Sequence, residues 1–188
     1  MFWSPLQRFG PSSFFLVAEF GWAWQNDGMR AMGRRSLPHH PPLGGTNQSV
    51  IVYVTMSVAG RRPLLDRPDA VGAILNAWKL AEHWLVGRYV IMPDHIHFFC
   101  APVMLPRTPL KRWMEFWRAV ATRHWPRMDE KPVWQRDFFD RQLRNSESYR
   151  QKWLYVWQNP AVANICATPE DWPWQGELNV LHWHEPAT

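Results

Sequence analysis

The sequence contains little cysteine, little tyrosine and no long apolar run. It has two cysteines among 188 residues, Cys100 and Cys166, without C-x-x-C spacing. We therefore expect neither a disulfide framework nor a zinc–thiolate site. No apolar stretch approaches the roughly 20 residues of a membrane helix. The apolar segment 14–24 contains Glu19 and is followed by no small-residue cleavage site. These absences predict a cytoplasmic protein without a membrane partner.

Positive charge is concentrated in one part of the sequence. The formal net charge is +5, but residues 103–160 hold 12 Lys and Arg against 6 Asp and Glu, whereas residues 161–188 hold none against 4. A basic segment of this kind is typical of proteins that bind a phosphate backbone. A solvated helix surface would give the same pattern, so charge alone does not decide between the two.

Two histidines one residue apart stand in the apolar segment 89–100. Pro93-Asp94 precedes them and Phe98-Phe99 follows, which predicts a short buried strand. Alternate side chains of a strand point to the same face, so His95 and His97 should project together. Two histidines at this spacing can arise by chance. Burying two imidazoles without polar partners, however, costs several kcal/mol. A shared metal cation is the simplest partner.

The apolar pattern predicts an α+β fold, with helices packed on a small antiparallel sheet. Residues 1–48 are rich in glycine and proline and are expected to form a partly disordered extension, 49–175 to form the domain, and 176–188 to form an irregular tail. We expect strands over 49–58, 88–92 and 95–101, a strand or extended arm over 133–143, and helices over 67–86, 108–125 and 146–159.

The last of these helices carries a tyrosine away from its apolar stripe. The stripe is expected to comprise Trp153, Val156 and Trp157. Tyr155 falls among polar residues instead, with Asn159 one turn further along the same face. A tyrosine on a polar helical face is more often merely exposed than functional.

Four motifs together resemble a known family. Met92-Pro-Asp-His-Ile-His-Phe-Phe99 is similar to the His-hydrophobic-His signature of single-tyrosine HUH transposases, specifically the REP-associated tyrosine transposases of bacteria. Three further segments resemble that family's blocks in order, over residues 50–175: Val133-Trp-Gln-Arg-Asp-Phe-Phe-Asp140 with Leu143-Arg144, Tyr155-Val-Trp-Gln-Asn-Pro160 and Pro169-Glu-Asp-Trp-Pro-Trp174. The chain departs from the family at two positions. The family usually has Asn where Asp94 stands. Many relatives carry a Lys near the position of Trp117, and here Arg118 or Lys111 could supply that positive charge.

The resemblance implies a ferredoxin/RRM-like HUH nuclease fold in a bacterial, cytoplasmic protein. The implied activity is a metal-dependent single-stranded DNA transposase or endonuclease that cleaves and rejoins hairpin, REP-like DNA through a 5′-phosphotyrosine. Tyr155 would be the nucleophile, and His95, His97 and Asn159 would bind Mg²⁺ or Mn²⁺. Two imidazole ligands favour Mn²⁺ in affinity. A non-cleaving DNA or RNA binder and a phosphoesterase with water as nucleophile are the alternatives.

The expected partner is single-stranded or hairpin DNA, bound by a monomer or a homodimer. We expect Trp172, Trp174 and Trp183 to be free to stack on bases, and we treat the pairs His39-His40 and His182/His184 as unrelated to the metal site. Cations expected to follow the DNA backbone are Lys111, Arg112, Arg118, Arg123, Arg136, Arg141, Arg144 and Lys152.

Overall fold

The computed structural model describes residues 50–103, 108–143 and 145–183. The predicted extension over residues 1–48, together with Arg144 and His184, lies outside the described residues. The helices and strands are β1 (Val52–Ser57), α1 (Pro68–Leu80), β2 (Trp84–Ile91), β3 (His95–Pro102), α2 (Leu110–Arg123), β4 (Phe139–Gln142), α3 (Ser146–Val162) and β5 (Gln175–Glu177), with short 3-10 turns at Ala59–Arg61, Met128–Glu130 and Pro169–Asp171.

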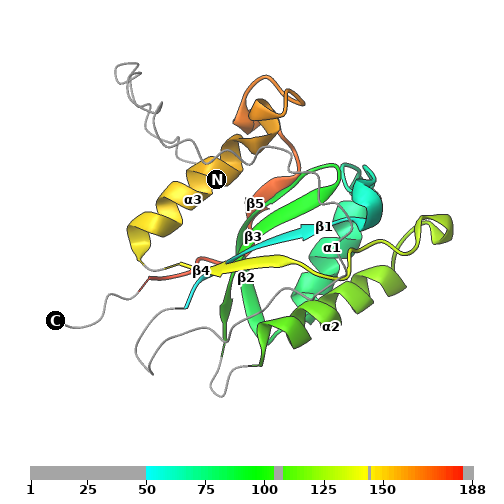
Figure 1. The fold of residues 1–188 in the computed structure, drawn as a ribbon, viewed down its shortest axis with the longest axis horizontal. Helices are drawn as coiled ribbons and strands as arrows, with labels where there is room; N and C mark the ends of the chain where they lie inside the picture. The colour runs from blue at the N-terminus through cyan, green and yellow to red at the C-terminus, as the bar shows by residue number, and fades with distance from the viewer. Residues whose placement is uncertain (1–49, 104–107, 144, 184–188) are drawn as a thin grey trace, which may run out of the picture. The chain divides into compact units, whose positions relative to one another are not determined.

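The five strands form one sheet in the order β4-β1-β3-β2-β5, and every neighbouring pair is antiparallel (Figure 1). From β1 to β4 the elements follow the β-α-β-β-α-β order of ferredoxin-like domains. The predicted α+β class, with helices on a small antiparallel sheet, is confirmed. None of the helices in the described ranges is long and apolar enough to cross a membrane.

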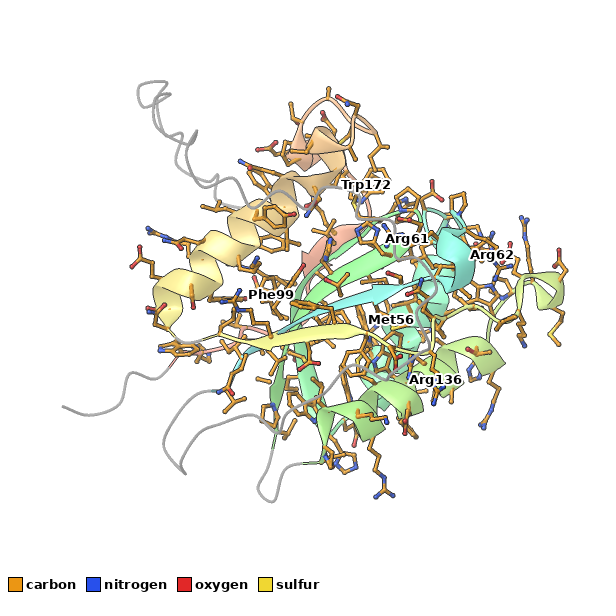
Figure 2. All side chains as sticks on the ribbon, viewed as in Figure 1. Met56, Arg61, Arg62, Phe99, Arg136 and Trp172 are labelled. Atoms are coloured by element: carbon orange, nitrogen blue, oxygen red, sulfur yellow. The ribbon has the colours of Figure 1, made fainter. Side chains whose placement is uncertain are left out.

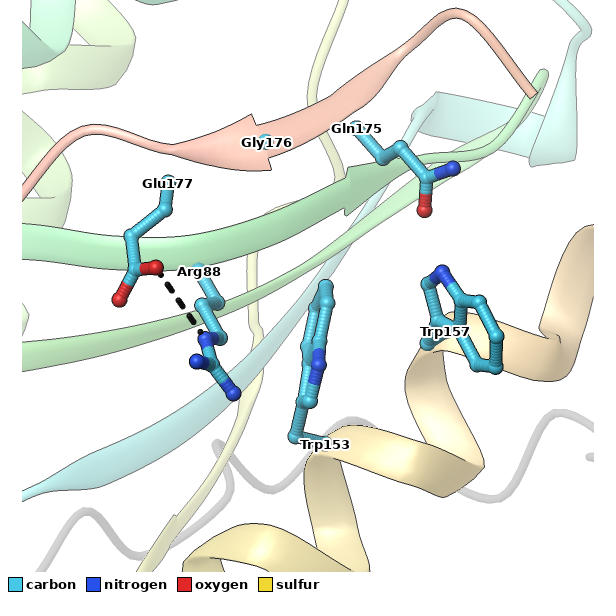
Figure 3. Close-up of a pocket in the computed structure, with 6 residues that line it drawn as sticks. All are labelled: Arg88, Trp153, Trp157, Gln175, Gly176 and Glu177. Carbon is cyan, nitrogen blue, oxygen red and sulfur yellow. Dashed lines mark ion pairs between the residues drawn. The ribbon is translucent and has the colours of Figure 1, made fainter. Parts of the chain in front are cut away.

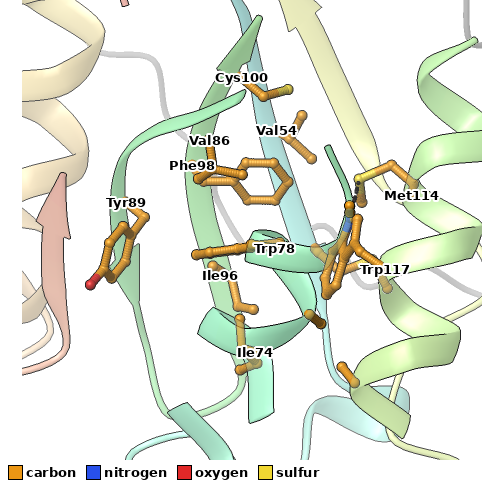
Figure 4. Close-up of a cluster of buried hydrophobic side chains, with 14 of the residues drawn as sticks. Val54, Ile74, Trp78, Val86, Tyr89, Ile96, Phe98, Cys100, Met114 and Trp117 are labelled. Atoms are coloured by element: carbon orange, nitrogen blue, oxygen red, sulfur yellow. Dashed lines mark hydrogen bonds between the residues drawn. The ribbon is translucent and has the colours of Figure 1, made fainter. Parts of the chain in front are cut away.

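Helices α1 and α2 cover one face of the sheet and bury the larger core. Trp78 of α1 and Trp117 of α2 enclose Phe98 of β3, with centroid distances of 5.1 Å and 6.2 Å to the Phe98 ring (Figure 4). Both Phe98 and Trp117 are fully buried. Large aromatic side chains of this kind contribute most of the apolar area in a core, which explains why so many tryptophans belong to the domain's interior.

Helix α3 packs on the opposite face, where Phe99, Tyr53 and Val90 belong to a second apolar cluster (Figures 1 and 2). Tyr149 lies edge-on to Phe99 at 4.9 Å between centroids, and Val156 is fully buried beneath the helix. Because alternate residues of β3 share a face, His95 and His97 lie on the same side as Phe99. The face that α3 covers is therefore the face that carries the histidine pair.

Several expected boundaries differ from the observed ones. Helix α1 ends at Leu80 rather than at residue 86, because β2 begins at Trp84. Leu85, expected in the helical stripe, is therefore an exposed strand residue, and Phe116 of α2 is likewise exposed. Of the expected segment 133–143, residues 139–142 form a regular strand and Trp134 adds an isolated bridge. Part of the expected irregular tail forms the edge strand β5.

A bulge in β2 decides which of its side chains face α3. The pairing with β3 shifts between Val86 and Tyr89, so that both residues belong to the core on the α1 side although they are three positions apart. An extra residue in one strand reverses the alternation beyond it. As a result, Arg88 turns to the α3 face, where its guanidinium lies over the rings of Tyr149 and Trp153.

Candidate metal centre and tyrosine face

The two histidines of β3 converge through one ring nitrogen each. The Nε2 atoms of His95 and His97 are 3.0 Å apart, and the rings are nearly perpendicular. His97 is buried, and His95 is partly buried at the start of the strand. The predicted projection of both imidazoles from one face of the strand is confirmed.

The Nδ1 atom of His97 is held by hydroxyl groups of β1. It lies 2.8 Å from Tyr53 Oη and 2.9 Å from Thr55 Oγ1, and the Thr55 hydroxyl donates to Tyr53 Oη. Either oxygen can accept from Nδ1–H, so the arrangement is compatible with the tautomer that has hydrogen on Nδ1. That tautomer leaves a lone pair on Nε2, the atom that faces His95.

The Nδ1 atom of His95 is held by a carboxylate. It lies 2.6 Å from Asp94 Oδ1, while Asp94 Oδ2 forms an ion pair with Nε of Arg61 at 2.8 Å. Arg61 also donates to the hydroxyl of Ser57 and lies where the chain leaves β1 (Figure 2). A carboxylate behind an imidazole fixes the ring and its tautomer, as is usual for histidines that bind metals.

The electrostatic environment keeps His97 neutral and Asp94 charged. Burial, and then unfavourable electrostatic interactions with His95, Arg61 and Lys152, hold the pKa of His97 well below its usual value. Burial alone would raise the pKa of Asp94, but the hydrogen bond and electrostatic interaction with His95, together with the charge of Arg61, bring it below its usual value. A neutral imidazole beside an ionised second-sphere carboxylate is the form that coordinates a cation.

The geometry of the pair fits one shared cation. Two nitrogens about 2.1 Å from a metal and separated by about 90° at that metal would be about 3 Å apart, which agrees with the observed 3.0 Å. Within the described ranges no cluster of three or more His, Cys, Asp or Glu side chains is placed to hold a metal. A cation at this pair would therefore complete its coordination with amide, water or substrate oxygen.

Tyr155 is connected to the histidines through two intermediate side chains. The ammonium of Lys152 lies 4.9 Å from the centroid of the Tyr155 ring and 5.3 Å from that of Tyr53, distances within cation–π range. Tyr53 in turn contacts His97. Tyr155 is 52% exposed and Tyr53 only 5%. Burial, opposed by the hydrogen bond from Thr55, raises the pKa of Tyr53 to about 12. Of these two phenols, Tyr155 is the one accessible to a large substrate.

Asn159 has a structural task that the sequence did not reveal. Pro160 lies inside α3 rather than after it, and a proline has no N–H for the carbonyl four residues earlier. The Nδ2 atom of Asn159 donates to that carbonyl, of Val156, at 3.2 Å, and also to the carbonyl of Tyr155 at 3.2 Å. These bonds use the nitrogen, which leaves Oδ1 as the ligating atom; coordination by Asn159 stays a prediction.

The cations predicted to contact DNA do not share one surface. Arg141 of β4 pairs with Tyr53 of β1, so it faces the α3 side close to Lys152, and after burial Arg141 is the next cause of the lowered pKa of Lys152. Arg118 is used within the protein, where it donates to the carbonyls of Gln135 and Arg136. Helix α2, on the opposite face of the sheet, carries Lys111, Arg112, Arg118 and Arg123.

One expectation about the tryptophans is wrong. Trp172 is buried at 8% exposure, and its indole N–H donates to the carbonyl of Ile91 at 2.9 Å. It therefore anchors the segment before β5 to the sheet (Figure 2) and is not free to stack on bases. Trp174 and Trp183 are partly buried. In α3, Val156 is buried as expected, whereas Trp153 and Trp157 remain partly exposed and line a pocket.

Sequence reasoning missed Tyr53, Thr55 and Arg61 as members of the site. The two strand residues alternate with apolar neighbours at the spacing that puts both on one face, but their partner is 42 and 44 positions away. Arg61 stands in the basic loop Gly60-Arg61-Arg62, where Gly60 and Arg61 both have positive φ. That turn brings the guanidinium back to Asp94.

The sheet is ferredoxin-like, and its two converging histidines lie on the face that the tyrosine-bearing helix α3 covers. The structure is similar to that of a REP-associated tyrosine transposase bound to a REP hairpin, at a TM-score of 0.60 and 21% identity, over 75% of this chain and 82% of that one. This likeness establishes the fold and confirms the predicted architecture.

A second similar structure is that of a proposed transposase from Deinococcus radiodurans R1. It matches at a TM-score of 0.45 and 12% identity, over 62% of this chain and 95% of that one, a likeness too low to establish a shared fold by itself. No protein-family model and no curated protein sequence matches this chain.

Proposed function

We propose that this protein is a metal-dependent single-stranded DNA transposase or endonuclease of the HUH tyrosine type, acting on hairpin DNA. The observation that carries the proposal is the convergence of the His95 and His97 Nε2 atoms at 3.0 Å, each ring held from behind at Nδ1. Two imidazoles arranged in this way on a rigid strand favour a bound cation over a structural role. The similar transposase structure, bound to a REP hairpin, supports DNA as the partner.

In the proposed reaction, Tyr155 Oη attacks the scissile phosphorus. The bond from phosphorus to the 3′ oxygen breaks, that oxygen leaves as a 3′-OH after taking up a proton, and the tyrosine gives up its own proton and retains the 5′ phosphate. A Mg²⁺ or Mn²⁺ ion held by His95, His97 and Asn159 would supply Lewis-acid polarisation of the phosphate. Attack by the freed 3′-OH on the phosphotyrosine reverses the step and rejoins the strand.

The surrounding residues suit this chemistry. Lys152, next to the Tyr155 ring, and Arg141 place positive charge where a phosphate would approach. Arg61 stands on the other side of the histidines, half exposed and bonded to Asp94. Tyr53 is a poorer candidate for the nucleophile, because it is buried and its pKa is raised to about 12.

A labelled hairpin oligonucleotide with a single-stranded flank tests the proposal. We expect incubation with Mn²⁺ to give a covalent protein–DNA band on a denaturing gel, absent with chelator and in Tyr155→Phe and His97→Ala. Tyr149→Phe, which removes a buried phenolic hydroxyl elsewhere on α3, serves as the matched control and should retain the band.

The alternative functions give different results in the same assay. Cleavage without a covalent band, unaffected by Tyr155→Phe, would identify a phosphoesterase that uses water. Binding of several hairpins with neither cleavage nor band would identify a non-cleaving binder. The cytoplasmic location, and the choice between monomer and homodimer, stay predictions.

A further inference from the structure

A pocket opens on the flank of α3 opposite Tyr155. It has a volume of about 330 Å³ and is lined by residues of β2, α3 and β5: Arg88, Trp153, Trp157, Gln175, Gly176 and Glu177 (Figure 3). This volume is at the lower end of the range for small-molecule sites. It suits one planar group rather than an extended chain.

The walls of the pocket are aromatic. Trp153 and Trp157 are one helical turn apart on α3 and project toward β2 and β5 (Figure 3). The Arg88 guanidinium lies 5.3 Å from the centroid of Trp153, so a cation–π contact already occupies one face of that ring. Trp157 stands at the open side, partly exposed. Partly exposed indole rings held by a scaffold are the stacking surfaces that proteins offer to unpaired bases.

The charge of the pocket argues against a phosphate as its ligand. Arg88 forms an ion pair with Glu177 at 3.4 Å, and both side chains are about one-third exposed. The two charges offset each other. By contrast, Lys152 and Arg141 lie on the other flank of α3. A single strand crossing α3 would meet positive charge on one flank and a neutral aromatic slot on the other.

A buried acceptor at the wall lacks a partner. Gln175 donates from Nε2 to the carbonyl of Pro169, while its Oε1 is buried and has no hydrogen bond in the described part of the chain. An unpaired buried acceptor is destabilising. Figure 3 shows this amide beside the two indole rings. An N–H group on the edge of a ring stacked against Trp157 would satisfy it after a small rotation of the terminal amide torsion, which is broad.

We propose that this pocket binds one unpaired nucleobase of the DNA strand, stacked on Trp157 and donating an N–H to Gln175. The proposal rests on the proposed function for its substrate class, and it adds a specificity site distinct from the histidines and Tyr155. It predicts a preference for a base that presents an N–H donor, either an exocyclic amino group or a ring N–H, over the same base without that donor.

The test measures binding without cleavage. Tyr155→Phe protein is titrated in chelator with a hairpin oligonucleotide whose single-stranded positions are made abasic one at a time. We expect one position at which loss of the base weakens binding roughly tenfold, the scale of one base–aromatic stack. Adding Trp157→Ala should weaken binding of the intact oligonucleotide similarly and abolish the effect of that abasic position. Trp157→Phe should preserve both.

Two further variants serve as a control for the stacking contact and as a test of the hydrogen bond. Phe116→Ala removes an exposed aromatic ring from α2, on the other face of the sheet, and should change nothing. Gln175→Leu should remove the preference for a donor-bearing base over the same base without that donor. The proposal is overturned if Trp157→Ala binds intact DNA like its parent, if the abasic effect persists in Trp157→Ala, or if no single-stranded position matters.

This outcome is independent of the cleavage assay. Adduct formation without any Trp157-dependent base effect would refute the pocket and leave the tyrosine nuclease intact. A Trp157-dependent base effect without an adduct would support the pocket and refute the cleavage reaction. Failure to bind any single-stranded DNA would overturn both.

Discussion

Asp94 forms an ion pair that the asparagine usual at this position in the resembling family could not form. The resembling family usually has Asn at this position, and Asn could also accept a hydrogen bond from His95. The carboxylate additionally pairs with Arg61 at 2.8 Å, which links the loop after β1 to the turn before β3. The backbone continues this link, since Val58 N–H donates to the Asp94 carbonyl at 2.9 Å. Aspartate at this position therefore adds an ion pair behind the histidine pair and removes no group that the proposed chemistry needs.

Tyr53→Phe tests whether the hydroxyl behind His97 supports the proposed metal binding by the histidine pair. The variant keeps the ring against its neighbours but removes the oxygen 2.8 Å from Nδ1. We expect Mn²⁺ affinity, measured by calorimetry, to fall about tenfold, as for other groups that orient metal-binding histidines. Tyr149→Phe is the control and should bind Mn²⁺ like the parent protein. Equal affinities for the two variants would contradict the account.

Glu130 provides a test of pH dependence. It is buried, forms a two-pronged ion pair with Arg67 and accepts a bond from Trp125 at 2.7 Å. The hydrogen bond from Arg67, aided by Trp125 and opposed by burial, lowers its pKa from 4.5 to about 2. Because the folded pKa is below the unfolded one, its stabilisation is complete above about pH 4.5 and is lost as the pH falls toward 2.

We therefore expect Glu130→Gln to lower the free energy of unfolding by about 3 kcal/mol at pH 7, the cost of removing one partner of a buried pair. The difference from the parent should shrink steadily below pH 4.5. Urea titrations followed by tryptophan fluorescence at pH 3, 4, 5 and 7 would measure it, with Glu82→Gln as an exposed control. A difference that does not change with pH would contradict the assigned role of the ionised carboxylate.

At the scale of elements, local patterns predicted most of the order but not the boundaries. The strand carrying His95 and His97 was predictable because its period and flanking turn are local. The end of α1, the bulge in β2 and the short strand β5 depend on pairing with distant strands. Pro160 was expected to end α3, but a side chain in the same helix, that of Asn159, takes over the carbonyl that the proline leaves unbonded.

Helix α3 offers a test of how firmly the tyrosine must be held. Asn145 accepts a hydrogen bond from the Ser148 N–H at 2.7 Å, and the Ser148 side chain bonds back to the Asn145 N–H. Asn145→Ala should reduce the free energy of unfolding by about 1 kcal/mol, measured by urea denaturation. It should also slow adduct formation, because fraying of α3 loosens its contacts with the sheet. Arg150→Ala, an exposed change in the same helix, should do neither.

At the scale of the whole molecule, the basic segment divides between two faces. The number of cations is plain from the sequence, but their faces are not, because the Arg141 side chain of β4 points to the α3 side while α2 covers the other side of a sheet whose order is set by long-range pairing. Lys111 and Arg112 stand on α2. Lys152 and Arg141 stand on the face that carries the histidines and Tyr155.

The salt dependence of DNA binding distinguishes these faces. We expect the double variant Lys152→Ala/Arg141→Ala to reduce the magnitude of the slope of log affinity against log salt by about 1.4, since each of the two lost phosphate contacts on a single strand contributes about 0.7. Lys111→Ala/Arg112→Ala should leave the slope unchanged. Fluorescence anisotropy between low and moderate salt would measure both. The reverse result would assign DNA to the α2 face.

The site was partly predictable for a related reason. His95 and His97 are neighbours along the chain, so their convergence followed from strand geometry. Tyr53, Thr55 and Lys152 reach the same place from other elements, and only the folded sheet shows that they meet. The pocket beside Trp157 likewise depends on the bulge that turns Arg88 toward α3.

Identification of the residue that becomes linked to DNA tests the central claim most directly. The protein would be incubated with Mn²⁺ and a hairpin oligonucleotide, digested with protease and nuclease, and analysed by mass spectrometry for a peptide that retains a 5′-linked nucleotide. We predict the nucleotide on Tyr155. A nucleotide on Tyr53, or cleavage of the DNA with no modified peptide, would contradict the assignment of Tyr155 as the nucleophile.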